Sequence, residues 1–97
     1  MNVAVCRLTL NMPENGTIKD KRQVVHSLCP RVRNKFNVSI AEVGDNDLWQ
    51  VATIGISCVS SDSRHAQQTI DNVLDYIRGL RLDAEIVDSE VELISGF

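Results

Sequence analysis

Basic side chains gather between Lys19 and Lys35, a stretch that holds six of the ten lysine and arginine residues. At about 100° per residue, an α-helix places four basic side chains of this stretch in one narrow stripe: Lys19, Arg22, His26 and Arg33. Lysine and arginine neutralise the phosphates of an RNA backbone, and histidine adds charge at lower pH. The pattern predicts an RNA-binding face formed by Lys19, Arg22, His26, Arg31 and Arg33. A solvated helix face that binds nothing is the alternative interpretation.

Acidic residues are segregated in the same way. Five of the thirteen follow the last basic residue, Arg81: Asp83, Glu85, Asp88, Glu90 and Glu92. Paired carboxylates can bind a divalent cation or perform acid–base catalysis, but the chain has no D-x-D-x-D-G loop or other spacing of metal ligands. Glu90 and Glu92 alternate with Val91 and Leu93, which is typical of the solvent face of an edge strand. Charges at an edge discourage aggregation, so we expect a protective edge and no metal site.

Cysteine and histidine offer little chemistry. The cysteines stand far apart, without a C-x-x-C pair or the spacing of a zinc site: Cys6, Cys29 and Cys58. Cys29 has His26 three residues before it as a candidate base, but its place beside Val25 and Val32 favours packing over nucleophilic catalysis. Glycines occur singly, which excludes a phosphate-binding loop. We expect no catalytic, cofactor or metal site, hence no enzyme, and reduced thiols in the cytoplasm.

Composition narrows the remaining functions. The 97 residues fit a single domain, 1–97, because domains cluster near ~100–150 residues. No apolar run approaches the ~18 residues that would predict a membrane span. A net charge of −3 excludes a uniformly basic nucleic-acid binder and leaves room for a local basic surface. Four aromatic residues are too few for a base-stacking platform: Phe36, Trp49, Tyr76 and Phe97.

The basic stretch must lie on a helix between two strands. Apolar residues alternate from Asn2 to Met12, which predicts a strand whose core face carries Ala4, Cys6, Leu8, Leu10 and Met12. Thr17 and Asp20 resemble a capping box and predict the start of a helix. That helix buries a stripe of residues spaced by three and four: Val25, Leu28, Val32 and Phe36. Pro30 predicts a kink or break near Cys29.

The second half repeats this plan. Asn37–Val43 and Leu48–Ser60 are predicted strands, joined by a hairpin turn at Gly44–Asp47. A second helix follows the capping candidates Ser60–Ser63, with a buried stripe of five residues: Ala66, Ile70, Val73, Leu74 and Ile77. The last strand changes phase between Ile86 and Val91, which predicts a bulge near Asp88 or Ser89.

The order β-α-β-β-α-β predicts an α+β fold of the ferredoxin-like type. Right-handed crossovers place the first and third strands at the centre of a four-stranded antiparallel sheet, with both helices on one face. The helix-free face is more apolar than a water-exposed surface normally is. Its apolar residues are Val3, Val5, Trp49, Val51 and Val59. We expect it to form a homo-oligomer interface. A half-solvated sheet, or docking of RNA or another protein, are the alternatives.

Five stretches have a distinctive residue order: V-C-R-L-T-L at Val5–Leu10, K-D-K-R-Q-V-V at Lys19–Val25, R-N-K-F-N-V-S-I-A-E-V at Arg33–Val43, D-L-W-Q at Asp47–Gln50 and C-V-S-S-D-S-R-H at Cys58–His65. Together they resemble the YlxP-like family of small bacterial proteins of unknown function. The resemblance implies a ferredoxin-like fold and genes that commonly neighbour those of ribosome-binding factor A and a translation initiation factor. It supplies no catalytic residues. The chain departs from the family's usual pattern at Pro30 and Gly44, where members usually carry a non-proline and an acidic residue.

Two hypotheses remain from the sequence. The first is an accessory protein of ribosome assembly or translation, whose partner is ribosomal RNA or an assembly particle bound through the basic helix. The second is a homo-oligomeric adaptor, such as a homodimer, that binds another protein through the valine-rich sheet face around Trp49. Neither requires a cofactor or a membrane.

Overall fold

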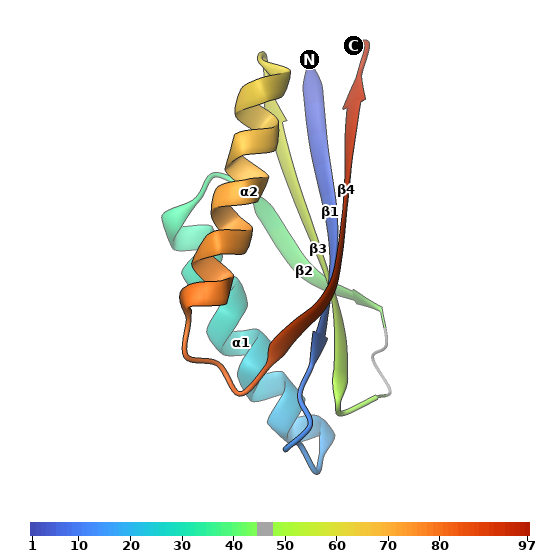
Figure 1. The fold of residues 1–97 in the computed structure, drawn as a ribbon, viewed down its shortest axis with the longest axis vertical. Helices are drawn as coiled ribbons and strands as arrows, with labels where there is room; N and C mark the ends of the chain where they lie inside the picture. Colours follow the sequence, from blue (N-terminus) through green and yellow to red (C-terminus); the bar gives the residue numbers. More distant parts are fainter. Residues whose placement is uncertain (45–47) are drawn as a thin grey trace.

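A computed structural model describes residues 1–44 and 48–97. These residues form six elements: β1 (Asn2–Asn11), α1 (Ile18–Lys35), β2 (Ser39–Gly44), β3 (Val51–Ser60), α2 (Ser63–Gly79) and β4 (Glu85–Ser95). The strands pair antiparallel in the order β2-β3-β1-β4, and both helices lie on the same side of the sheet (Figure 1). The predicted α+β, ferredoxin-like fold is confirmed, with β1 and β3 at the centre.

Alternate residues of the central strands form the core. Their buried side chains are those that the alternation predicts: Ala4, Cys6, Leu8 and Leu10 from β1, and Ala52, Ile54, Ile56 and Cys58 from β3. The predicted stripe of α2 is buried against them, together with Leu28 and Val32 of α1. Because a shift of one residue would turn a whole strand over, burial of this face determines the register of the sheet.

Both helices begin at side-chain caps. Thr17 Oγ1 accepts a hydrogen bond from the Asp20 amide at 3.2 Å, and the Asp20 carboxylate accepts one from the Thr17 amide at 3.2 Å. This reciprocal pair is the predicted capping box. At α2, Asp62 Oδ1 accepts from the Arg64 amide at 2.9 Å, which selects one cap among the candidates of the sequence.

Pro30 leaves α1 unbroken, so of the kink or break expected near Cys29 the break is absent. The helix continues from Ile18 to Lys35. Pro30 and His26 are both exposed, so the carbonyl that loses its hydrogen-bond donor lies on the solvent side, where water can replace the donor. Val32 meanwhile keeps the buried register of the helix.

The strands around the hairpin are shorter than predicted. β2 begins at Ser39 and β3 at Val51, so Leu48–Gln50 lie before the strand. A backbone hydrogen bond joins this segment to the loop after β1: the Met12 amide donates to the Gln50 carbonyl at 2.7 Å. Residues 45–47 of the predicted turn lie outside the described residues.

The predicted bulge of the last strand is present one residue earlier than expected. Thr9 pairs with Asp88 and Leu10 with Ile86, which leaves Val87 as the extra residue of β4. The bulge restores the apolar phase, since Ile86 and Val91 then face the same side of the sheet.

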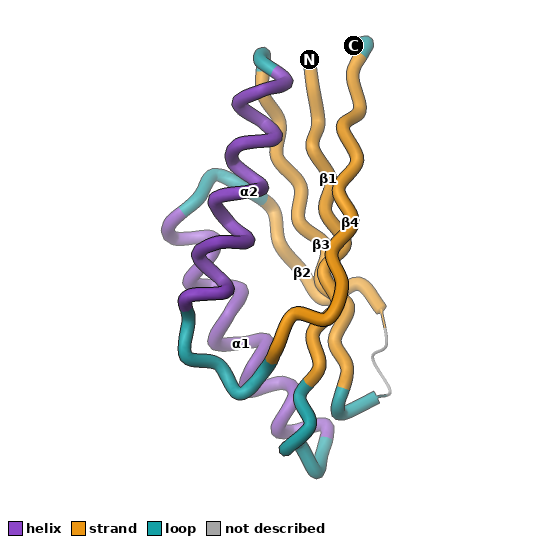
Figure 2. The backbone as a smooth tube through the Cα atoms, viewed as in Figure 1, coloured by secondary structure: helices purple, strands orange, loops and turns teal. Residues whose placement is uncertain are grey.

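The helices divide the sheet between them. α1 packs on β2 and β3, whereas α2 packs on β1, β3 and β4. Figure 2 shows the two termini at the same end of the sheet, where the Met1 amino group donates to the Phe97 carbonyl. Of the helices in the described ranges, neither is long and apolar enough to cross a membrane.

Candidate functional site

Lys19, Arg22 and His26 lie exposed along one side of the first three turns of α1. Within residues 1–44 and 48–97, no carboxylate lies within ion-pair distance of these three side chains. The nearby Asp20 carboxylate is occupied by the helix cap. We call the surface formed by Lys19, Arg22 and His26 the α1 basic face.

The other two predicted RNA-binding residues, Arg31 and Arg33, differ from these three in direction or in bonding. Arg33 Nη2 donates to the Ile40 carbonyl at 2.9 Å, which fastens the end of α1 to β2. Arg31 follows His26 by five residues and therefore points about 140° away around the helix axis. Three of the five predicted residues therefore form one face. Arg33 lies on the same side of the helix but is bonded to β2, and Arg31 points away.

Lys21 is a charged residue whose role the sequence analysis missed. Only 2% of its side chain is exposed, and its Nζ lies 2.9 Å from Glu42 Oε2. The same Nζ donates to the Val51 carbonyl at 3.1 Å. The signal was available in the sequence, because Lys21 precedes Val25 by four residues and Leu28 by seven. It therefore continues the buried stripe of the helix.

The surroundings of Lys21 explain why it is buried. An ammonium group removed from water loses several kcal/mol of solvation unless a counter-charge and hydrogen bonds replace the water. Glu42 supplies the charge from β2 and Val51 supplies a carbonyl from β3. Lys21 therefore joins α1 to two strands, and its charge faces away from the α1 basic face.

A second polar link holds the segment before β3. Asn15, itself buried, donates through Nδ2 to the Trp49 carbonyl at 3.0 Å. Gln50 Nε2 donates to the carbonyl of Pro13 at 3.5 Å. The Trp49 side chain stays 47% exposed beside Leu48, around a depression of about 200 Å³. The structure places Trp49 before β3 and not within the strand.

The open sheet face, opposite the helices, carries the predicted valines. Val5 and Val59 are exposed, the latter by 62%, while Val3 and Val51 are half-buried. The register places Ile94 on this face as well, which the sequence did not indicate. Ile94 of β4 pairs with Val3 of β1, and Val3 pairs on its other side with Val59 of β3. These side chains form an apolar patch that continues across three strands.

A shallow depression of about 300 Å³ extends the open sheet face toward β2. Its lining is mostly apolar: Val5, Ser39, Ile40, Ala41, Val43, Gly55, Ile56 and Ser57. Gly55 makes the close packing possible, because a Cβ at that position would lie 2.9 Å from Val43 Cγ1. A glycine inside a strand indicates such a close approach, so Gly55 is the residue in the sequence that could have pointed to this depression.

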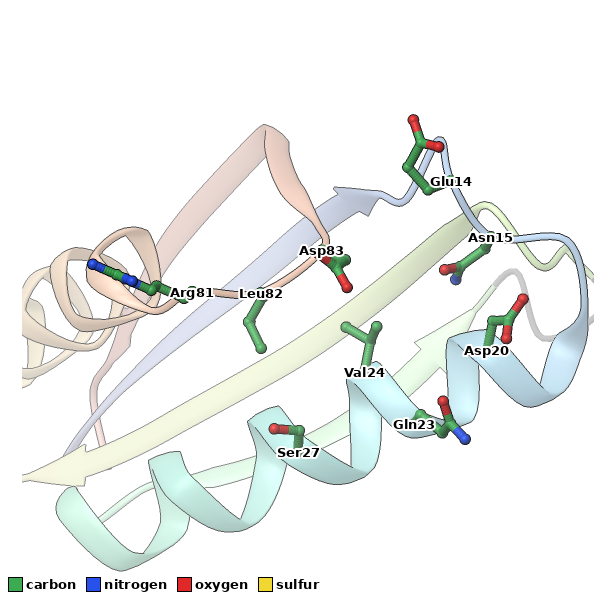
Figure 3. A pocket seen from close by; sticks show the side chains of 9 residues that line it. All are labelled: Glu14, Asn15, Asp20, Gln23, Val24, Ser27, Arg81, Leu82 and Asp83. Atoms are coloured by element: carbon green, nitrogen blue, oxygen red, sulfur yellow. The ribbon is translucent and has the colours of Figure 1, made fainter.

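Another cavity, of about 380 Å³, lies between the first half of α1 and the segment that joins α2 to β4 (Figure 3). Val24 and Asn15 face it from one side, and Leu82 and Asp83 from the other. Glu14 and Asp20 add carboxylates to its lining. Among the described residues, no three histidine, cysteine or acidic side chains are grouped to hold a metal ion.

Cys29 does not have the surroundings of a nucleophile. Its side chain is buried, whereas His26, the candidate base, is exposed. Burial raises the pKa of the Cys29 thiol, and the smaller opposing influence of Arg33 does not cancel this effect. Burial also raises the pKa of Cys6. Both thiols therefore stay protonated near neutral pH, unlike the thiolates of reactive cysteines.

Comparison with known proteins places these features in a family. A family model described as "Protein of unknown function (DUF503)" matches residues 3–91. The chain belongs to this family. It is also similar to the uncharacterized protein YlxP of Bacillus subtilis (strain 168), with 44% identity over 62 residues that cover 64% of this chain and 67% of that protein. The YlxP-like resemblance is confirmed.

Two solved structures are similar to this chain at low sequence identity. The de novo designed protein Foldit4 aligns over all of both chains with a TM-score of 0.55 and 16% identity. The de novo designed protein Ferredog-Diesel aligns over 93% of this chain and 83% of its own, with a TM-score of 0.45 and 12% identity. The first likeness agrees with the ferredoxin-like topology.

Two stretches that resemble the DUF503 family meet in the fold. Lys21 belongs to Lys19–Val25 and Glu42 belongs to Arg33–Val43, and these two side chains form the buried ion pair. The first of these stretches also carries two residues of the α1 basic face, Lys19 and Arg22. The ion pair therefore fixes the helix turn from which these cations project.

Proposed function

We propose that this protein is a non-catalytic, cytoplasmic accessory factor of ribosome assembly or translation that binds RNA through the α1 basic face. The supporting observation is that Lys19, Arg22 and His26 project together from α1 without a carboxylate partner in the described part of the chain. Phosphates are natural counter-ions for such a surface. Ribosomal RNA and assembly particles are the partners that the family resemblance suggests.

Charge segregation in the fold supports an oriented contact with RNA. α1 packs on β2 and β3, whereas the acidic residues of β4 lie at the opposite edge of the sheet. An RNA backbone is attracted to one side of the molecule and repelled from the other. The net charge of −3 is therefore compatible with local RNA binding.

Two of the four aromatic residues are engaged within the protein, which favours contact with the backbone of RNA over stacking on its bases. Phe36 and Tyr76 pack edge to face with ring centroids 5.5 Å apart. Lys35 Nζ lies 5.3 Å from the centroid of the Tyr76 ring. Because these two rings are engaged within the protein, they offer no free platform for bases.

Filter binding of ribosomal RNA fragments at rising salt tests this proposal. Two or three phosphate contacts predict that log affinity falls against log salt with a slope of about −1.5 to −2. Lys19→Ala combined with Arg22→Ala should weaken binding and flatten that slope. Arg64→Ala combined with Arg81→Ala removes the same charge from exposed positions elsewhere and should bind like the wild type. The proposal fails if the first pair binds as the wild type does, or if the wild type binds no better than a neutral protein.

A second candidate function is a homodimeric adaptor that uses the open sheet face. Val5, Val43, Val59 and Ile94 are exposed hydrophobic residues on this side of the sheet or at its edges. The molecule measures 43 × 22 × 19 Å, so the sheet has room for the ~800 Å² per partner that a stable interface buries. Covering this apolar surface with a second copy would supply the hydrophobic stabilisation of a dimer.

Light scattering tests the dimer. The wild type should have twice the chain mass of 10.8 kDa, and Val59→Glu should be monomeric because it buries a charge in the interface. Asn72→Glu adds the same charge on the exposed side of α2 and should remain a dimer. A monomeric wild type at micromolar concentration contradicts this candidate.

A further inference from the structure

β4 forms an edge of the sheet with a free side along eleven residues, Glu85–Ser95. Figure 1 shows β4 as the outermost strand, next to β1. Every residue of β4 from Val87 onward is exposed. Among the described residues, no strand other than β1 pairs with it. Its outward N–H and C=O groups are therefore open to an additional strand.

The two faces of β4 differ sharply in chemistry after the bulge. Asp88, Glu90 and Glu92 pair with open-face residues of β1 and therefore share that face. Val91 and Leu93 pair with Cys6 and Ala4 and lie on the helix side. The strand thus carries an acidic row on one face and an apolar row on the other.

The apolar row is incompletely covered. Val91 and Leu93 are 38% and 41% exposed, although their neighbours Cys6 and Ala4 on β1 are completely buried. The cover that α2 provides over β4 is therefore only partial. Leu93 borders a depression of about 280 Å³ against the first half of α2, lined also by Ser63, Arg64, Gln67, Gln68 and Asp71.

The acidic row retains unneutralised charge. Glu90 Oε1 accepts from Arg7 Nη2 at 2.7 Å across the sheet. Asp88 and Glu92 have no comparable cation within residues 1–44 and 48–97. A strand added beside β4 would place its own open-face side chains next to these two carboxylates.

We propose that β4 is a strand-addition site for an extended segment of a partner protein in which basic residues alternate with apolar ones. The backbone of the segment pairs with the free edge of β4. Its basic side chains face Asp88 and Glu92, and its apolar side chains cover Val91 and Leu93 beside α2. Main-chain pairing provides affinity and the alternating side chains provide specificity.

A second copy of this chain does not fit the same edge. If two β4 strands paired antiparallel about Glu90, Glu90 would face its own copy and Asp88 would face Glu92. Centring the pair on Val91 would bring Glu90 opposite Glu92. Like charges directly opposite one another destabilise a strand pair, so the charges select a basic partner and reject self-pairing. The inference does not depend on RNA binding, which uses α1.

A nine-residue peptide of alternating lysine and valine, with blocked ends, is the probe for this site. Fluorescence anisotropy should detect its binding to the full chain, and hydrogen exchange should slow at alternate amides of β4. A glutamate–valine peptide, and a peptide with all lysines before all valines, should bind at least tenfold more weakly. Added salt should weaken the binding of the lysine–valine peptide because the charges are exposed.

Charge reversal locates the site. Asp88→Lys combined with Glu92→Lys should weaken peptide binding about tenfold, since two exposed attractions become repulsions. Glu14→Lys combined with Asp83→Lys makes the same change in net charge outside the segment Asp88–Leu93 and should bind like the wild type. The proposal is overturned by equal binding of all three peptides, by equal effects of the two variants, or by protection of α1 or β2 in place of β4. It is also overturned if β4 is protected in the free protein by self-association.

Discussion

Lys21 Nζ lies 2.9 Å from Glu42 Oε2 in the interior of the protein, where 2% of the lysine side chain and 23% of the glutamate side chain are exposed. The pair connects α1 to β2, and the hydrogen bond from Lys21 to the Val51 carbonyl extends the connection to β3. A charge buried in this way stabilises the fold only while its partner is present.

Glu42→Gln should therefore destabilise the protein more than an ordinary surface change. It removes the carboxylate charge that lies 2.9 Å from the buried Lys21 ammonium, a change that costs about 3–5 kcal/mol when a pair is fully buried. Because Glu42 is partly exposed, we expect about 2–3 kcal/mol, measured by urea unfolding. Glu90→Gln breaks an exposed pair with Arg7 and should cost less than about 1 kcal/mol. Equal losses for the two variants would show that the buried Lys21–Glu42 pair contributes no more stability than the exposed Arg7–Glu90 pair.

Lys21→Met separates the structural lysine from the RNA-binding residues. Methionine fills a similar length of space. Glu42 Oε2 is buried, but the glutamate side chain is 23% exposed, so its carboxylate can turn toward water. We expect a smaller loss of stability than for Glu42→Gln. The affinity for ribosomal RNA fragments should match that of the wild type in filter binding. A loss of affinity as large as that of Arg22→Ala would place Lys21 among the RNA contacts.

Pro30→Ala should stabilise the protein. Pro30 is exposed inside a continuous helix, so alanine restores a backbone hydrogen bond without disturbing the core. Proline is about 3 kcal/mol less favourable than alanine inside a helix, but it also restricts the unfolded chain. We expect a net gain of about 1–2 kcal/mol in urea unfolding. Asn34→Ala, at an exposed position of the same helix, should gain about 0.5 kcal/mol or less. A destabilised Pro30→Ala variant would contradict this account of the helix.

The core and the topology could be predicted because periodicity reports burial directly. The alternation through Ala4, Cys6 and Leu8 and the spacing of Ile70, Val73 and Ile77 each specify one buried face. With those faces buried together, right-handed crossovers allow the predicted order of strands. The bulge was also visible, since Ile86 and Val91 could not share a face without an extra residue.

The candidate sites were only partly predictable because they depend on side-chain partners. The sequence grouped Arg33 with Lys19 and Arg22, but the carbonyl that Arg33 bonds belongs to Ile40 on another element. The exposure of the Leu93 side chain depends on how far α2 extends over the sheet, and no local sequence pattern contains that information. Pairing of Lys21 with Glu42 likewise joins residues that are distant in the sequence.

Gly55→Ala tests the close packing on the open sheet face. The new Cβ would lie 2.9 Å from Val43 Cγ1, so Val43 must move. We expect a loss of about 1–2 kcal/mol in urea unfolding, as in other overpacked sites. Val43 is 60% exposed, so Val43→Ala alone should change stability little. In the double variant the penalty of Gly55→Ala should disappear, which measures the coupling of the two residues. Additive losses would show that another contact restricts position 55.

The buried thiols predict a loss of stability at alkaline pH. Burial raises the pKa of Cys6 and Cys29 in the folded protein, whereas unfolded thiols titrate near pH ~8.5. Between these values the unfolded chain binds fewer protons than the folded one, so the free energy of unfolding falls as pH rises. The contribution is complete below the unfolded pKa and is lost as pH rises through the folded values. Urea unfolding from pH 7 to pH 10 should show this decline.

Cys6→Ala combined with Cys29→Ala provides the control for the thiol effect. This variant should be less stable at pH 7 because it loses buried sulfur atoms, but its stability should decline less between pH 8 and pH 10. A disulfide reagent should also react with the wild-type thiols slowly in the folded protein and rapidly in urea, because protonated and buried thiols are poor nucleophiles. If the two proteins decline in parallel above pH 8, groups other than Cys6 and Cys29 control the alkaline transition.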